Sequence, residues 1–139
     1  MTASASRGFA VLTSILGVFL LVTAFAGDWF EVSGNPQDMW QSFSVVDVFV
    51  AASALIAIAA GPAAILAERQ GLAVTLATIS ANFAVLATLL LIWRTIDPPG
   101  DQTVRELGFW VGLGLQVGVL VGSFAAMGGG SPPRLSSTR

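Results

Sequence analysis

The sequence predicts an all-α protein, an integral membrane antiparallel four-helix bundle, and three observations lead to this prediction. The 139-residue chain is 55% hydrophobic and only 10% charged, with a mean hydropathy of +0.81. Soluble domains carry about 25% charged residues, so a chain this apolar cannot cover a water-exposed surface. Four apolar runs of about 20 residues each match the length of helix that crosses a bilayer. Nothing between them is long enough to form a second domain.

The four runs and their connections define the expected elements. The first run, Phe9 to Ala26, contains no charged residue, and the polar segment after it has Gly34-Asn35-Pro36 as its turn. Pro98 and Pro99 end the third helix, because proline cannot continue a helix. The Gly-, Ser- and Pro-rich residues 128–139 predict a disordered cytoplasmic tail after a transmembrane domain of residues 1–127. The helices are expected at about residues 8–27, 44–67, 71–96 and 107–127.

An alternative exists for the first run. Ala24-Phe25-Ala26 resembles the A-x-A cleavage site of a secretory signal, and cleavage there would leave three helices. The run is 18 residues long, whereas the apolar region of a signal peptide has roughly 7–15. Its length therefore favours an uncleaved transmembrane helix.

Charged residues and tryptophans divide the loops into two sides. With a cytoplasmic N-terminus, four Arg and one acid lie inside, and two Arg and seven acids lie outside, so the sides are net +3 and −5. This Arg asymmetry predicts that both termini are cytoplasmic. The Arg-only, Ala- and Gly-rich composition is typical of a bacterial source, which predicts a multi-pass protein of the bacterial cell membrane. The interface aromatics all fall near the outer face, where an apolar ring with a polar N–H is favoured: Trp29, Trp40, Trp93 and Trp110.

Two charged residues are expected to meet beneath the outer loops. The short link 67–71 makes the second and third helices antiparallel neighbours, so Asp47 and Arg94 lie at similar depth. A charge within a membrane usually faces the bundle interior with a partner. We therefore predict an Asp47–Arg94 structural ion pair that fixes the register of the two helices. Two alternatives stay open: a ligand or ion site, and helix capping by Asp47, because Ser44-x-x-Asp47 resembles a capping box.

Small residues indicate where the helices pack. Gly114, Gly118 and Gly122 recur every four residues in the fourth helix and permit close backbone approach, either within the bundle or between copies of the chain. In the third helix, small residues spaced by four and three form a stripe on one side. Its members are Ala73, Ala77, Ser80, Ala84, Ala87, Leu91 and Arg94.

Two amides lie deep in the apolar runs and are expected to join helices by hydrogen bonds: Asn82 and Gln116. Asn82 falls with Thr75 and Thr78 on the side nearly opposite the small-residue stripe. A helix with packing signals on both sides indicates a second neighbour or another subunit.

The residue inventory restricts the chemistry. The chain has no Cys and no His, which removes thiol nucleophiles, the common zinc sites and His-based acid–base catalysis. The outer acids lack the regular spacing of an EF-hand, and no nucleotide-binding or hydrolase motif is present. A net charge of −2 without a basic patch argues against nucleic acid. We predict no enzyme, cofactor or metal site.

Four segments resemble a known group. They are Asp28-Trp29-Phe30, the run from Trp40 to Asp47, the run from Arg94 to Gly100, and the run from Gly108 to Gly112. Together they resemble a family of small actinobacterial four-transmembrane-helix membrane proteins of unknown function, over most of residues 8–127. The resemblance implies the same topology and no chemistry.

The sequence thus favours a non-enzymatic integral membrane protein, an accessory or structural subunit or scaffold of a membrane assembly. Its expected partners are the lipid bilayer and other membrane protein subunits or a second copy of the chain. The alternatives are a small transporter or channel subunit and an envelope sensor that binds a ligand at the outer side.

Overall fold

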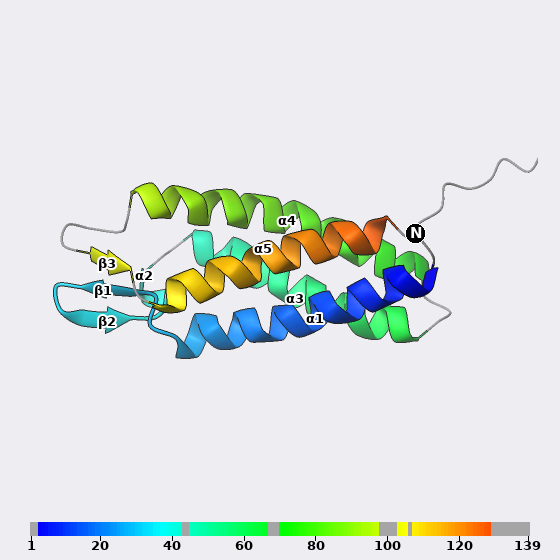
Figure 1. Ribbon diagram of the computed structural model, residues 1–139, viewed down its shortest axis with the longest axis horizontal. Coiled ribbons are helices and arrows are strands. Elements are labelled where there is room, and N and C mark those ends of the chain that lie inside the picture. Colours follow the sequence, from blue (N-terminus) through cyan, green and yellow to red (C-terminus); the bar gives the residue numbers. More distant parts are fainter. Residues whose placement is uncertain (1–2, 43–44, 67–69, 98–102, 106, 129–139) are drawn as a thin grey trace, which may run out of the picture.

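The computed structural model describes residues 3–42, 45–66, 70–97, 103–105 and 107–128. Four long helices lie side by side along the molecule (Figure 1). All four are long and apolar enough to cross a membrane. Their bounds differ from the predicted ranges by a few residues, most at the start of the first, which begins five residues earlier than expected. They are α1 (Ala3–Ala26), α3 (Val46–Ile65), α4 (Gln70–Ile96) and α5 (Leu107–Met127).

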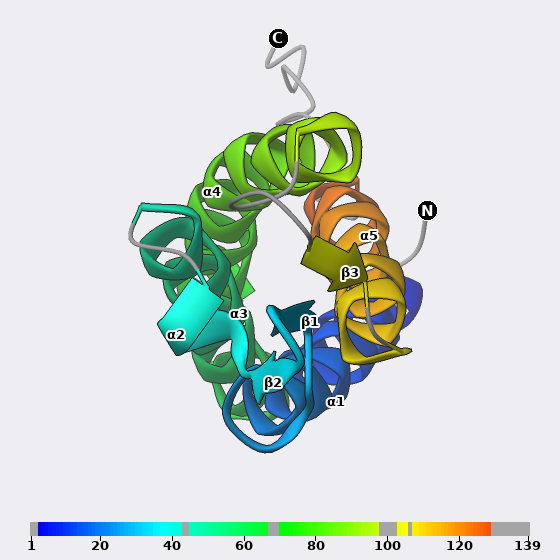
Figure 2. The same cartoon turned by 90° about the vertical axis from the view of Figure 1, so that its left-hand side faces the viewer.

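The long helices form a ring in which each has two main neighbours, and α3 and α5 also touch across it. α1 contacts α3 and α5, and α4 contacts the same two helices, as the end view in Figure 2 shows. α1 starts at the right-hand end of Figure 1 and α5 starts at the left-hand end. α2 (Met39–Ser42) is a single turn between the first two long helices.

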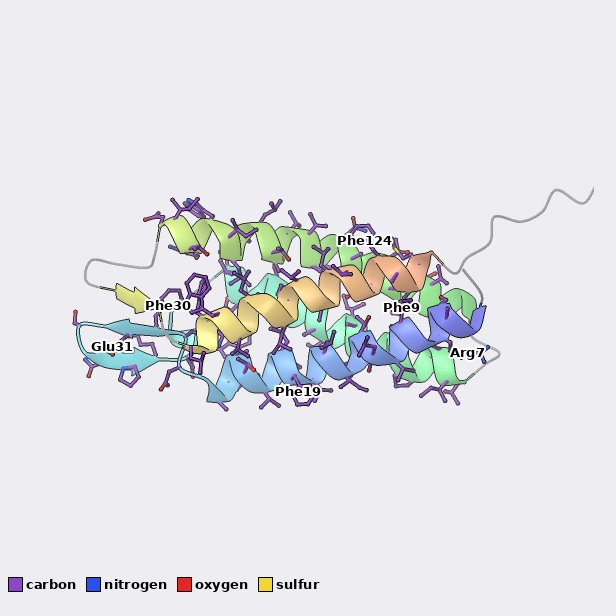
Figure 3. All side chains as sticks on the ribbon, viewed as in Figure 1. Arg7, Phe9, Phe19, Phe30, Glu31 and Phe124 are labelled. Carbon is purple, nitrogen blue, oxygen red and sulfur yellow. The ribbon has the colours of Figure 1, made fainter. Side chains whose placement is uncertain are left out.

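Many of the buried side chains of the long helices are small, and large apolar side chains cover the exterior of the ring. The predicted stripe of α4 is buried from Ala73 to Leu91, and its last member, Arg94, is half-buried. In contrast, Phe19 is 56% exposed and points away from the bundle in Figure 3. Leu55, Leu89 and Val121 are similarly exposed. Small residues between helices and large apolar residues outside are typical of helices that associate within lipid.

Three short strands cover the left-hand end of the ring in Figure 1, a feature that the all-α prediction did not include. They form one antiparallel sheet in the order β2-β1-β3. We call these strands and α2 the cap, and this end the capped end. The strands are β1 (Phe30–Val32), β2 (Asn35–Gln37) and β3 (Thr103–Arg105).

The cap hairpin turns one residue earlier than predicted. Val32 pairs with Asn35, so the loop is Ser33-Gly34, and both of its residues have positive φ, +52° and +83°. Two positive φ angles are the mark of a type I′ turn, whose twist matches that of the strands. Pro36 lies in β2 rather than in the turn, and β2 is an edge strand, where proline is tolerated.

Candidate functional site

Trp29 is a core residue of the capped end, a packing role that the sequence analysis did not predict. Its side chain is fully buried, and its Nε1 donates a hydrogen bond of 2.8 Å to the carbonyl oxygen of Thr23. Its backbone N–H donates to the carbonyl oxygen of Gln37 at 2.9 Å. The indole meets the buried Phe109 edge-on at 6.1 Å, and Phe30 lies 5.0 Å from the same ring. Trp29 therefore ties the cap to α1 and α5.

Two glycines at the start of α5 make room for this arrangement. The backbone N–H of Gly108 donates to the carbonyl oxygen of Asp28 at 3.0 Å, and a Cβ at Gly108 would overlap that oxygen. A Cβ at Gly112 would overlap the indole ring of Trp29. The buried tryptophan and the glycines opposite it are therefore one packing unit.

The other three tryptophans are partly or largely exposed near the same end. Trp93 and Trp110 are 51% and 49% exposed, and Trp40 is half-buried. Trp40 stacks on Phe25 at 5.3 Å, and Trp110 meets Phe109 edge-on at 5.2 Å. Their role as membrane-interface aromatics stays a prediction.

The predicted Asp47–Arg94 ion pair is not among the contacts of the described residues. Asp47 is buried in the first turn of α3, and its Oδ1 accepts a 3.0 Å hydrogen bond from the N–H of Val48. The guanidinium of Arg94 lies 5.3 Å from the ring of Trp93, and its Nη1 is 3.5 Å from the carbonyl oxygen of Asp97. Asp47 thus lies at the start of α3, where unpaired N–H groups favour an acid. Arg94 lies near the end of α4, where unpaired carbonyl groups favour a base. Ser44, the other half of the proposed capping box, lies outside the described residues.

A chain of polar groups crosses the middle of the bundle. Gln116 is fully buried, and its Nε2 donates to Ser53 Oγ at 3.1 Å. Ser80 donates to the carbonyl oxygen of Ser53 at 3.0 Å, and Ser123 donates to Ser80 Oγ at 3.2 Å. A hydroxyl has one hydrogen, and Ser53 is closer to the carbonyl oxygen of Val50 (2.9 Å) than to Gln116 Oε1 (3.2 Å). This polar network joins α3, α4 and α5, as expected for Gln116.

α1 is joined to its neighbours by hydroxyl groups that the sequence analysis did not single out. Ser14 donates to the carbonyl oxygen of Ile58 in α3 at 2.8 Å, and Ser6 donates to that of Ala126 in α5. The available signal was the presence of isolated hydroxyls within an otherwise apolar run. Inside lipid such groups act as polar contacts between helices.

The three glycines of α5 do not share one environment. Gly122 is buried against the hydroxyl of Thr13, and a Cβ at Gly118 would lie 3.1 Å from Leu16, so both pack against α1. Gly114 is exposed and has open space around it. Each step of four residues turns a helix about 40° beyond one full turn, so a series of three spreads over about 80° of the surface.

Asn82 lies on the exterior of the bundle, near the middle of α4. Thr75, Thr78 and Asn82 are all exposed, and their spacing of three and four places them on one side. Asn82 Nδ2 donates to the carbonyl oxygen of Thr78 at 2.9 Å, and both threonines donate to carbonyl oxygens four residues earlier. We call these three residues the polar face of α4. Within the described part of the chain, the side-chain hydrogen bonds of this face all stay within α4.

Comparisons with known proteins add no family assignment. No family model matches the chain, and neither the curated proteins nor the solved structures searched include a match. Among the described residues, no group of three or more His, Cys, Asp or Glu is placed to hold a metal ion. The argument for function therefore rests on the arrangement of the chain's own residues.

Proposed function

We propose that the protein spans a bacterial cell membrane as an antiparallel four-helix bundle with both termini in the cytoplasm. Four helices of sufficient length and apolarity support this proposal, as do the large apolar side chains on the exterior. The charge difference between the two sides of the chain supports the orientation, with Arg in excess on the side of the termini. The cap then lies outside the cell.

The orientation can be tested with single cysteines, because the natural chain has none. Glu31 lies in β1 of the cap, at the left-hand end of the molecule in Figure 3, and Gly71 lies in the first turn of α4 at the opposite end. In intact cells, a membrane-impermeant maleimide should label Glu31→Cys and should label Gly71→Cys only after permeabilisation. The reverse pattern, or equal labelling of both, would contradict the proposed orientation.

Within that membrane we propose a non-enzymatic role, as an accessory or structural subunit of a membrane assembly. The polar face of α4 carries the proposal. Asn82 uses one amide hydrogen within its own helix, and no described residue forms a hydrogen bond with its Oδ1 or its second amide hydrogen. In lipid there is no water to satisfy them, and a polar side chain there commonly bonds to another helix.

The expected partner is a membrane-spanning helix that offers both a donor and an acceptor at mid-membrane depth. An Asn, Gln, Ser or Thr side chain meets this requirement. Thr75 and Thr78 add two short side chains on the same side of α4, and short side chains allow a neighbouring helix to approach closely. The partner would therefore pack lengthwise along the half of α4 that begins at its N-terminus.

The test is purification of the tagged full chain in a mild detergent, followed by mass spectrometry of the intact assembly. We expect a partner subunit in fixed stoichiometry with the natural chain and its loss with Asn82→Leu, which keeps the branched shape of the side chain and removes its polar atoms. Leu55→Ala is the matched control, since Leu55 is 57% exposed on α3. A monomer or a homo-oligomer that Asn82→Leu leaves unchanged would contradict the proposal.

A further inference from the structure

A groove opens between α1 and α3 at the end of the bundle opposite the cap. Nearer the middle these helices are in close contact, because a Cβ at Gly61 would overlap the side chain of Ser14. Toward the end, nothing lies within 4 Å of the point where Gly8 would carry a Cβ. The resulting groove has a volume of about 500 Å³ and is lined by Arg7, Gly8, Val11 and Ile65.

Arg7 is the polar residue of this groove. Its side chain is half-buried, and its Nε is buried without a hydrogen-bond partner in the described part of the chain. Figure 3 places Arg7 at one end of the molecule and Glu31 at the other. The acids whose side chains are described all lie in the cap or at the helix ends next to it: Asp28, Glu31, Asp38, Asp47 and Asp97.

We propose that this groove binds one phospholipid with an anionic headgroup, with its phosphate on the guanidinium of Arg7 and an acyl chain along Val11 and Ile65. A guanidinium presents its N–H groups in a planar fork that fits phosphate oxygens. Because the Nε of Arg7 is covered by protein, the phosphate would bind the terminal Nη groups. Basic pockets between helices on the cytoplasmic side commonly bind such headgroups. The inference rests on the proposed membrane location but not on the proposed subunit role.

The depth and the apolar walls favour a lipid over a free phosphate ion. Arg7 lies about one turn into α1, at the level where a helix that crosses the hydrocarbon core meets the headgroups. From there toward the middle of α1, Leu12 and Ile15 are each 49% exposed and continue the apolar surface. A free phosphate would use the guanidinium alone, whereas a phospholipid uses the guanidinium and the apolar surface beside it.

The test is a lipid titration of the purified full chain in a nonionic detergent, read by native mass spectrometry. Phosphatidylglycerol and phosphatidylcholine with identical acyl chains are the probes. We expect one phosphatidylglycerol per chain, bound about fivefold more tightly than phosphatidylcholine, the ratio for one favourable Arg contact. Arg7→Gln should remove this preference.

A second pair of variants distinguishes lipid binding in the groove from non-specific attraction of an anionic lipid to a positive charge. Gly8→Leu should fill the groove and weaken the binding of both lipids. Gly71→Leu should leave the binding of both lipids unchanged, because a Cβ at Gly71 also meets nothing within 4 Å and Gly71 does not line the groove. Equal affinity for the two lipids, or no effect of either Arg7→Gln or Gly8→Leu, would overturn the proposal. Displacement of the lipid by inorganic phosphate alone would also overturn it, in favour of a phosphate site.

The subunit role and the lipid site fail independently. Asn82→Leu should bind phosphatidylglycerol as the natural chain does, because the polar face of α4 and the groove lie on different helices. Suppose that the maleimide labelling confirms the membrane orientation but the chain binds phosphatidylglycerol and phosphatidylcholine equally. That result would refute only the lipid site and leave the membrane location intact.

Discussion

Replacing Trp29 by Ala should destabilise the protein far more than the same change at an exposed tryptophan. Trp29 is fully buried, whereas Trp93 is 51% exposed. Truncating a buried tryptophan to alanine costs about 3–5 kcal/mol, because the removed ring leaves a cavity that the surrounding residues fill only in part. The change also leaves the Thr23 carbonyl oxygen without its 2.8 Å donor. We therefore expect Trp29→Ala near the upper end of that range and Trp93→Ala at about 1 kcal/mol or less.

The assay is reversible unfolding of the purified chain in mixed micelles with increasing denaturing detergent, followed by far-ultraviolet circular dichroism. Trp29→Phe keeps one aromatic ring but removes the Nε1 hydrogen bond and part of the ring volume. Its cost should therefore lie between about 1 kcal/mol, the loss of one buried hydrogen bond, and the cost of Trp29→Ala. Equal destabilisation by Trp29→Ala and Trp93→Ala would refute the burial of Trp29 and restore the view that all four tryptophans are interface residues.

The remaining predictions use the same unfolding assay. Gly122→Leu should lower the free energy of unfolding by at least about 2 kcal/mol through overpacking, whereas Gly114→Leu should change it by less than about 0.5 kcal/mol; equal effects would contradict the packing of α5. Asp47→Asn and Arg94→Gln should be additive within about 0.5 kcal/mol, because no ion pair joins them in the described residues, and a larger coupling would restore the predicted pair. Gly34→Ala should cost about 1 kcal/mol through its positive φ alone, and an unchanged stability would contradict the type I′ turn.

The long helices and their buried faces could be predicted from the sequence because both have a periodic signal. Four apolar runs correspond to the four long helices, and the small-residue stripe of α4 is the buried side of that helix. The same reasoning placed Asn82 on the opposite side, where the structure has it exposed. Hydropathy and spacing therefore determine the secondary structure and the buried and exposed sides of these helices.

The cap could not be predicted in the same way, because three-residue strands are too short for an alternating pattern. The sequence did contain a local signal in Ser33-Gly34, but the neighbouring Asn35-Pro36 is an equally good turn sequence. The position of Trp29 depends on the cap, since the chain enters β1 at the next residue. Composition alone could not separate this tryptophan from the three that are partly or largely exposed.

The ion pair stays a prediction, because depth along two helices does not specify direction around them. Asp47 and Arg94 lie at matching ends of α3 and α4, and no contact between the two is among those of the described residues. The glycine series of α5 has the same difficulty, because regular spacing in the sequence turns steadily around the helix. Contacts that depend on the direction of a side chain around its helix axis can be assigned only from the packed structure.

The most direct test of the proposed subunit role is photo-crosslinking from the polar face of α4 in native membranes. The cysteine-free chain allows a benzophenone maleimide to be attached at one position, Thr78→Cys, with Val121→Cys on the exposed side of α5 as the control. We expect a discrete protein adduct from position 78 that is absent from position 121 and is lost when Asn82→Leu is added. Adducts of equal yield from both positions, or adducts with lipid alone from position 78, would contradict the docking of a partner on this face.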